Sequence, residues 1–173
     1  MPRSRVEGKA WISHAVARLR PATILDVGPG LGTYANLLRG ITPDATWSCV
    51  EVHEPYVEMF SLRQKYDIIY ICDIRNFAWP QRYDVVILGD VLEHLRLADA
   101  RSVWASARAH ARSLVLSIPI VEYPQGMSYD NVHETHLHTW SHDLVVDLLP
   151  GISRWECNSH IGVYFARGTL ALT

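Results

Sequence analysis

The chain has 173 residues, of which 49% are hydrophobic and 20% are charged, and its formal net charge is −2. This composition excludes a disordered chain, a collagen-like repeat and a coiled coil, and the length predicts a single domain over residues 1–173. The near-neutral charge gives no general attraction to nucleic acid or to anionic lipid, so we do not expect a nucleic-acid partner.

The cysteines and the hydrophobic runs indicate the compartment. Cys49, Cys72 and Cys157 are far apart and form no CxxC pair, which fits neither a disulfide framework nor a zinc knuckle. No run of 18 apolar residues occurs, so we expect no membrane span. The sequence therefore predicts a cytoplasmic protein.

The first predicted element is a helix over residues 5–20, which is basic but which we expect to pack on the sheet rather than to act as a transit peptide. Short runs rich in Val, Ile and Leu then alternate with helix-like intervals. Such runs are typical of strands that are buried on both faces. We expect strands at residues 23–27, 47–52, 68–72, 83–88 and 113–118, and crossover helices at residues 34–39, 55–66 and 97–112.

The alternation stops after Ile118. Residues 119–140 have little periodicity but contain aromatic residues and histidines, so we expect a lid or pocket wall there. Ser141 is a candidate N-cap for a helix that continues to Leu149. Strand-like residues 154–158 and 163–167 then predict an antiparallel hairpin at the edge of the sheet.

Together these elements predict an α/β fold. It is a Rossmann-like, doubly wound and mostly parallel sheet of seven strands, with an antiparallel edge hairpin and helices on both faces in a three-layer arrangement. In such folds, ligands bind outside the carboxyl ends of the strands.

A glycine-rich turn follows the first strand in the sequence ILDVGPGLGT, residues 24–33. Glycines in such a turn let a ligand approach the backbone closely. Their spacing, at Gly28, Gly30 and Gly32, differs from the Gly-x-Gly-x-x-Gly that seats a dinucleotide pyrophosphate. Asp26 would repel a phosphate, so the turn suits a ligand that carries a positive charge.

Carboxylates stand at the ends of the next three strands, at Glu51, Asp73 and Asp90. A carboxylate after the second strand can accept hydrogen bonds from both hydroxyls of a ribose, and Asp73 could accept one from an adenine amine. Structural alternatives stay open: a helix N-cap for Asp73 and a solvated loop charge for Asp90.

The order of the motifs ILDVGPGLGT, VEVHE, ICDIRNF, YDVVILGDVLEHL and LVLSIPI resembles the class I S-adenosylmethionine-dependent methyltransferases over nearly the whole chain. The resemblance implies S-adenosylmethionine as cofactor and S-adenosylhomocysteine as product. It also implies that residues 22–118 form the cofactor-binding half, residues 119–140 an acceptor-facing loop, and residues 141–173 the last helix and the hairpin.

The resemblance also implies individual roles. Gly28 and Gly30 would line the methionine moiety, Glu51 would bind the ribose, Asp73 and Ile74 would meet the adenine, and Asp90 would lie near the methionine end. The complete set of expected cofactor-binding residues is Asp26, Gly28, Pro29, Gly30, Gly32, Thr33, Glu51, Val52, Asp73, Ile74, Gly89 and Asp90.

A methyl group on a sulfonium is already activated, so the enzyme must hold donor and acceptor in line and remove a proton where needed. After the fourth strand the chain has neither the Asn/Asp-Pro-Pro-Tyr segment typical of base and amide methylation nor a Pro-Cys pair. We therefore expect an O, N or C atom of a small-molecule acceptor to be methylated.

Histidines are the candidate general bases, because imidazole accepts protons near neutral pH. We expect one of His94, His136 and His138 to face the acceptor, and the last two to share one side if the backbone there is extended. The alternative for each is a structural histidine that is held by hydrogen bonds.

An alternative is an RNA 2′-O-methyltransferase with a divalent metal site. Asp90, Glu93, His94 and His136 are similar to the metal-binding pattern of small-RNA 3′-terminal 2′-O-methyltransferases, and two carboxylates with two imidazoles are reasonable ligands. Because Leu-Glu-His-Leu is widespread among metal-independent relatives and Asp90 departs from the Glu of that pattern, we expect no metal.

Two further classes stay open: an NAD-dependent oxidoreductase, and a non-catalytic partner subunit that binds S-adenosylmethionine. A homodimer is compatible with each of them.

Overall fold

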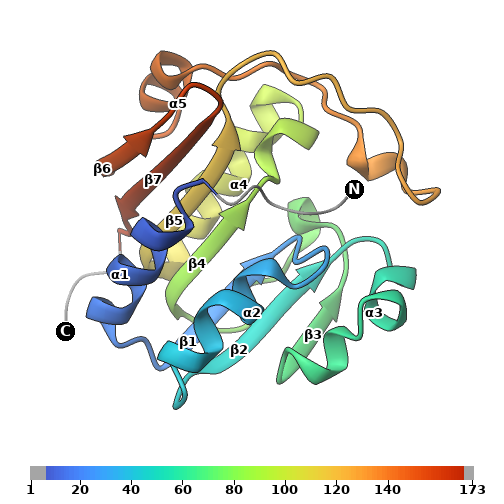
Figure 1. Ribbon diagram of the computed structural model, residues 1–173, viewed down its shortest axis with the longest axis vertical. Helices are drawn as coiled ribbons and strands as arrows, with labels where there is room; N and C mark the ends of the chain where they lie inside the picture. The colour runs from blue at the N-terminus through green and yellow to red at the C-terminus, as the bar shows by residue number, and fades with distance from the viewer. Residues whose placement is uncertain (1–6, 170–173) are drawn as a thin grey trace.

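The computed structural model describes residues 7–169 and contains one seven-stranded sheet with the order β3-β2-β1-β4-β5-β7-β6 (Figure 1). Strands β1 to β5 are parallel to one another, whereas β7 is antiparallel to both β5 and β6. The strands are β1 (Thr23–Val27), β2 (Thr46–Glu51), β3 (Ile68–Ile71), β4 (Tyr83–Gly89), β5 (Ala111–Pro119), β6 (Ile152–Cys157) and β7 (Ile161–Arg167). The expected fold class is confirmed.

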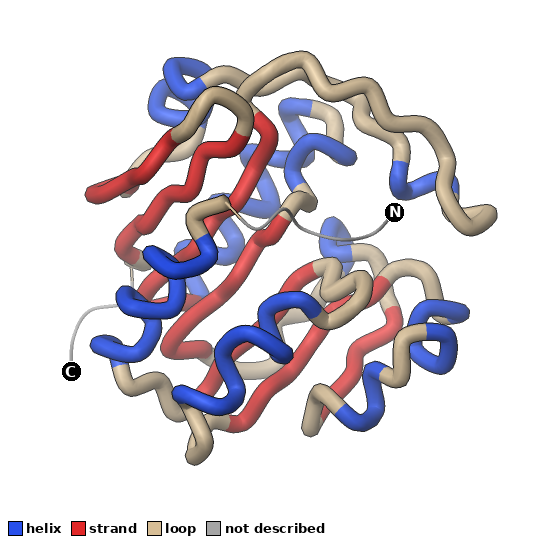
Figure 2. The backbone as a smooth tube through the Cα atoms, in the orientation of Figure 1, coloured by secondary structure: helices blue, strands red, loops and turns tan. Residues whose placement is uncertain are grey.

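Helices cover both faces of the sheet (Figure 2). One face packs against α1, α2 and α3, and the other packs against α4 and α5. The helices are α1 (Lys9–Leu19), α2 (Thr33–Leu38), α3 (Pro55–Met59), α4 (Leu97–His110) and α5 (His142–Leu148), with short 3-10 turns η1 (Arg39–Ile41), η2 (Leu62–Gln64), η3 (Ile74–Asn76), η4 (Leu92–His94) and η5 (Val132–Glu134).

Strand β4 shows why polar and apolar residues do not alternate along the central strands. Val85 and Ile87 pack in the cluster that contains α1 and α2, whereas Val86 and Leu88 pack in the cluster that contains α4. All four side chains are fully buried. A strand that is covered on both faces reads as a continuous apolar run, which is the pattern used to predict it.

The N-terminal helix was expected over residues 5–20, and α1 occupies Lys9–Leu19. Residues 5 and 6 of that expectation lie outside the described residues. Ile12 and Val16 of α1 are fully buried against the sheet, as expected for a packing helix. No helix within residues 7–169 is long and apolar enough to cross a membrane.

The helix expected over residues 55–66 is shorter in the structure, because α3 ends at Met59 and only one 3-10 turn, η2, follows it. Ser61 has a φ of 51°, a left-handed conformation that interrupts a helix. The Lys65 amino group donates hydrogen bonds to the carbonyl of Phe60 at 2.6 Å and to that of Leu31 at 2.9 Å. The break therefore lets Lys65 tie the end of α3 to the glycine-rich turn.

The C-terminal elements follow the prediction closely. The Ser141 hydroxyl accepts a hydrogen bond from the Leu144 amide at 3.1 Å, which is the expected N-cap of α5. Strands β6 and β7 form the antiparallel hairpin, but β7 lies between β5 and β6, so of these two strands only β6 is at an edge of the sheet.

Candidate functional site

A cavity of about 500 Å³ opens at the carboxyl ends of the parallel strands. The chain order reverses between β1 and β4, so these strand ends form the crevice in which doubly wound folds bind ligands. Of the residues expected to bind cofactor or to act on the acceptor, the following line this cavity: Gly28, Pro29, Gly30, Thr33, Glu51, Val52, Asp73, Ile74, Gly89, Asp90, His94 and His136.

Three expected site residues are not among those that line the cavity: Asp26, Gly32 and His138. Asp26 is fully buried in β1, where its carboxylate accepts a hydrogen bond from the Tyr66 hydroxyl at 2.6 Å. Gly32 packs closely against the Lys65 side chain, since a Cβ on Gly32 would lie 2.6 Å from Cδ of Lys65. His138 is exposed, so the structure separates it from His136 although the two are only two residues apart.

The glycine-rich turn lies along one wall of the cavity. Gly28 has a φ of 61° and Gly30 a φ of 49°, both in the left-handed region that glycine tolerates without strain. The Gly28 amide donates a hydrogen bond to the carbonyl of Val50 at 2.9 Å, which fixes the start of the turn against β2. A ligand in the cavity therefore meets bare backbone at this wall.

Glu51 lies at the end of β2 and only 3% of its surface is exposed. Its Oε1 accepts a hydrogen bond from the His53 amide at 2.8 Å. Burial raises the pKa of the Glu51 carboxyl to about 7, and the nearby charge of Glu134 acts in the same direction. Hydroxyl donors of a ligand would stabilise the charged form of this buried acceptor.

Asp73 lines the cavity but is already paired. It caps η3 by accepting a hydrogen bond from the Arg75 amide at 2.8 Å, and the Arg75 guanidinium also binds its carboxylate. Hydrogen bonding to Arg75 lowers the pKa of Asp73. Asp73 therefore acts as an N-cap, as the structural alternative expected. An adenine amine would have to share the Asp73 carboxylate with Arg75.

Tyr34 is a lining residue that the sequence analysis missed. It is buried, and its hydroxyl accepts a hydrogen bond from the Lys9 amino group of α1 at 2.6 Å. Burial lowers the pKa of Lys9 to about 8. A Cβ on Gly89 would lie 2.0 Å from Cε2 of the Tyr34 ring, so the glycine that ends β4 makes room for this tyrosine.

The Gly89→Ala variant should be destabilised by about 1 to 2 kcal/mol, because the added methyl group forces the buried Tyr34 ring to move. Urea denaturation of the two proteins measures this difference in the free energy of unfolding. Gly40→Ala is the matched control, since a Cβ there meets no atom within 4 Å. Equal stability of Gly89→Ala and the parent protein would show that the ring is free to shift.

The acceptor-facing loop, residues 119–140, is fixed over the cavity by polar contacts. The Tyr56 hydroxyl donates a hydrogen bond to the Glu134 carboxylate at 3.2 Å, and Gln125 Nε2 donates to the Glu134 carbonyl at 2.9 Å. The amide of Leu137 donates to the carbonyl of Glu93 at 2.8 Å. The contacts of Glu134 with Tyr56 and of Leu137 with Glu93 join residues far apart in sequence, so no local pattern reveals them.

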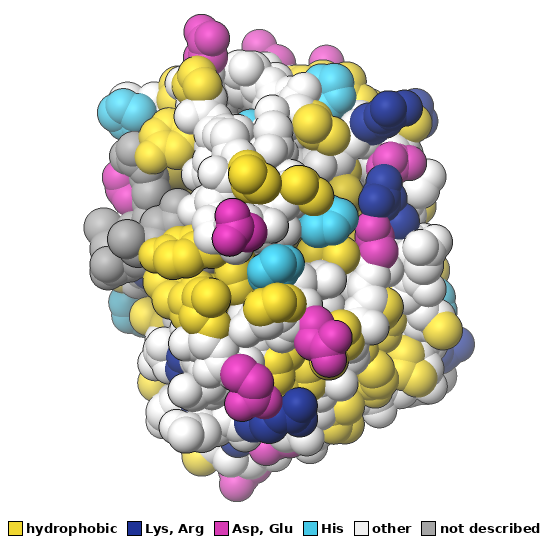
Figure 3. All heavy atoms as spheres, turned by 90° about the vertical axis from the view of Figure 1, so that its right-hand side faces the viewer, with side chains coloured by type: hydrophobic (Ala, Val, Ile, Leu, Met, Phe, Trp, Pro, Cys, Tyr) yellow, Lys and Arg dark blue, Asp and Glu magenta, His cyan; other side chains and the backbone are white. Residues whose placement is uncertain are grey.

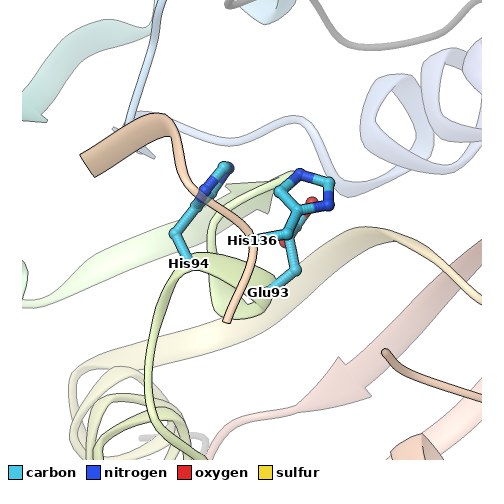
Figure 4. A group of neighbouring side chains, drawn as sticks. All are labelled: Glu93, His94 and His136. Atoms are coloured by element: carbon cyan, nitrogen blue, oxygen red, sulfur yellow. The ribbon is translucent and has the colours of Figure 1, made fainter. Parts of the chain in front are cut away.

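His94 and His136 approach each other at the mouth of the cavity, with ring centroids 4.7 Å apart (Figure 4). Burial lowers the pKa of His94 to about 4, and it lowers that of His136 as well. Glu93 lies beside them and is 1% exposed, and burial raises the pKa of its carboxyl well above the usual range. From the sequence alone, Glu93 is a candidate only as a ligand in the metal-dependent alternative.

The acceptor-facing loop also exposes apolar side chains. On the face turned toward the viewer in Figure 3, hydrophobic, acidic and histidine side chains lie interspersed. The large exposed hydrophobic residues of this loop are Tyr123, Met127, Tyr129, Val132 and Leu137.

Comparison with known proteins identifies the fold by structure alone. No protein-family profile matches the chain, and no curated protein matches its sequence. Among solved structures, the 1,6-didemethyltoxoflavin-N1-methyltransferase of Burkholderia thailandensis, with its substrate and S-adenosylhomocysteine bound, aligns with a TM-score of 0.71 at 20% identity. That alignment covers 94% of this chain and 77% of the other.

The PH0226 protein of Pyrococcus horikoshii OT3 aligns with a TM-score of 0.74 at 12% identity, over 95% of this chain and 90% of that one. The N-terminal domain of EvdMO1, determined with SAH and D-fucose, aligns with a TM-score of 0.68 at 14% identity, over 95% and 84%. At these identities the likeness concerns architecture. The chain has the class I S-adenosylmethionine-dependent methyltransferase fold.

Proposed function

We propose that the protein is an enzyme that binds S-adenosylmethionine and transfers its methyl group to an atom of a small-molecule acceptor. The observation that carries this proposal is the convergence of Gly28, Gly30 and Glu51 on one cavity at the carboxyl ends of β1 and β2. Structures of similar fold that hold S-adenosylhomocysteine support the choice of cofactor.

The residues present fit this cofactor. A cavity of about 500 Å³ is within the range of small-ligand sites. Acidic side chains dominate its buried polar wall, with Glu51, Glu93 and Glu134 at most 9% exposed. These carboxylates suit a ligand with a sulfonium and an ammonium group on Coulomb grounds. Glu51 would hold the ribose, and the turn at Gly28 and Gly30 would line the methionine part.

When bound, the cofactor supplies a methyl group that is already activated by the sulfonium. The protein has to orient an acceptor toward it and exclude water. The acceptor-facing loop would provide that wall. The imidazoles of His94 and His136 line the same cavity and would receive the proton that leaves the acceptor. His138 is exposed and is not among the lining residues, so it is not proposed for this role.

The chemistry of the acceptor-facing loop favours a small, partly apolar acceptor over RNA. Residues 119–140 contain no Lys or Arg, and they include Glu122, Asp130 and Glu134. RNA affinity rests largely on the neutralisation of phosphates by basic side chains. Exposed Tyr123 and Val132 line the cavity instead and offer contact to an apolar ring or chain.

Calorimetric titration with S-adenosylmethionine, S-adenosylhomocysteine and NAD is the direct test. We expect binding of the first two and no competition by NAD. No heat and no thermal stabilisation up to millimolar S-adenosylmethionine would reject the proposal. Incubation with labelled cofactor and a cell extract, followed by mass spectrometry of the labelled product, then identifies the acceptor. Binding without any turnover would favour the non-catalytic partner subunit.

His136→Ala should leave the affinity for S-adenosylhomocysteine within about twofold and slow methyl transfer by about 100-fold or more, the usual range for loss of a group that assists proton removal. The exposed His160→Ala variant controls for loss of any histidine. Single-turnover rates with the identified acceptor measure the effect. A normal rate in His136→Ala would make His136 part of the scaffold.

A further inference from the structure

Three side chains that line the cavity form a compact group of donor atoms (Figure 4). Each of Glu93, His94 and His136 offers one ligand atom, and these three atoms lie within 4.8 Å of one another. Atoms that bind one tetrahedral ion at about 2.1 Å are about 3.4 Å apart, so the most distant pair would have to approach by at most about 1.4 Å to close the group around a cation.

Glu93 supplies an independent sign that a ligand belongs there. Both of its carboxylate oxygens are buried, and neither has a hydrogen-bond partner within the described residues 7–169. Buried polar atoms are nearly always paired in folded proteins, because an unpaired one costs its full desolvation. A proton-accepting role for one histidine explains neither these two oxygens nor the presence of a second imidazole.

One ring nitrogen of each histidine lies within hydrogen-bonding distance of a backbone carbonyl. Nδ1 of His94 lies 3.2 Å from the Thr135 carbonyl, and Nδ1 of His136 lies 2.6 Å from the Tyr123 carbonyl. A carbonyl only accepts, so each Nδ1 carries the hydrogen and each neutral ring presents a lone pair on Nε2. Metal-binding histidines characteristically donate their other ring N–H in this way.

From this geometry we propose that Glu93, His94 and His136 bind one divalent cation of the first transition series, such as Zn²⁺, Co²⁺ or Mn²⁺. One carboxylate oxygen and two imidazole nitrogens suit these ions better than Mg²⁺ or Ca²⁺, which prefer oxygen ligands. The carboxylate of Asp90 lines the same cavity and adds negative charge. This proposal replaces the sequence-based expectation that the protein has no metal.

The backbone holds the site together before an ion arrives. Glu93 and His94 belong to η4, which follows β4, whereas His136 belongs to the acceptor-facing loop. The amide of Leu137, next to His136, donates a hydrogen bond to the Glu93 carbonyl at 2.8 Å. The two halves of the site are therefore joined directly, so the protein loses less conformational entropy when an ion binds.

Three protein ligands leave coordination positions open toward the cavity. On the basis of the proposed methyl transfer, a bound cation would favour an acceptor hydroxyl at the open position. It would lower the pKa of that hydroxyl, so that the proton could pass to solvent and the oxygen could take the methyl group. The carbon–sulfur bond would break with its electron pair on sulfur, which would give a methyl ether and S-adenosylhomocysteine.

Metal binding is tested on the full chain without cofactor or acceptor. Protein freed of metal by chelator is titrated with Zn²⁺ by calorimetry and with Co²⁺ by visible absorption. We expect one ion per chain with micromolar affinity or better. Glu93→Gln and His136→Ala should each weaken binding by about 100-fold, whereas the exposed His160→Ala should bind as the parent protein does. His136→Ala tests the site even if Glu93→Gln fails to fold, because His136 lies on a partly exposed loop.

Absence of binding at millimolar Zn²⁺ and Co²⁺ would overturn the metal site. Unchanged affinity in His136→Ala and in a folded Glu93→Gln would do the same. Neither result bears on the affinity for S-adenosylmethionine, so failure of the metal site and failure of the proposed methyl transfer are seen in separate measurements.

Discussion

Replacement of Glu51 by alanine should weaken the binding of both S-adenosylmethionine and S-adenosylhomocysteine by about 10- to 100-fold. Glu51 is 3% exposed and is the carboxylate at the end of β2 that lines the cavity. Loss of a buried acceptor leaves the ribose hydroxyls without a partner, and this costs about 1 to 3 kcal/mol. Calorimetric titration with S-adenosylhomocysteine measures the change without turnover.

Two control variants make this result specific. Glu51→Gln keeps one acceptor oxygen of similar size, so it should bind with an affinity between those of the parent protein and Glu51→Ala. Glu58→Ala removes an exposed carboxylate of α3, and its cofactor affinity should be unchanged. Parent-like affinity in Glu51→Ala would remove Glu51 from the cofactor site and weaken the whole assignment of the cavity.

The Asp26→Asn variant should gain stability over the parent protein as the pH rises. Burial raises the pKa of the Asp26 carboxyl from 3.8 to about 7, although the Tyr66 hydroxyl and the charge of Lys9 oppose the change. The folded protein therefore binds this proton more tightly than the unfolded chain. The stability that this proton contributes is complete below pH 3.8 and is lost as the pH rises to about 7.

Asparagine cannot ionise, so the Asp26→Asn variant does not lose stability in this way as the pH rises. The difference in the free energy of unfolding between Asp26→Asn and the parent protein should move in favour of the variant by about 2 kcal/mol between pH 5 and pH 8. Urea denaturation at several pH values measures this difference. The Asp44→Asn variant, at an exposed position, serves as the control for the same change of side chain at the surface. A difference that is constant with pH would show that Asp26 keeps its ordinary pKa.

The sheet could be predicted because its strands are buried on both faces and therefore leave continuous apolar runs in the sequence. The edge at which Gly28, Glu51 and Gly89 meet could also be predicted, because parallel strands end on the same side. Local signals sufficed in both cases. The N-cap at Ser141 is equally local, and its hydrogen bond to Leu144 follows from spacing alone.

The features that sequence could not predict depend on contacts between distant residues. The early end of α3 involves Lys65 and the carbonyl of Leu31, which are 34 residues apart. The sequence of β4 alone does not show that Gly89 leaves space for the Tyr34 ring. His136 differs from His138 because its amide donates to the carbonyl of Gln125 within the loop and the next amide, of Leu137, donates to the carbonyl of Glu93 in η4, contacts that the periodicity of the loop does not show.

The acceptor-facing loop has an evolutionary consequence. This continuous stretch contributes many of the residues that line the cavity, whereas the glycine-rich turn follows β1 and Glu51 ends β2. Mutation or recombination within about 20 codons could therefore change the acceptor selectivity and leave the residues proposed to bind the cofactor unchanged. Chimaeras that exchange only this stretch are a practical route to altered selectivity.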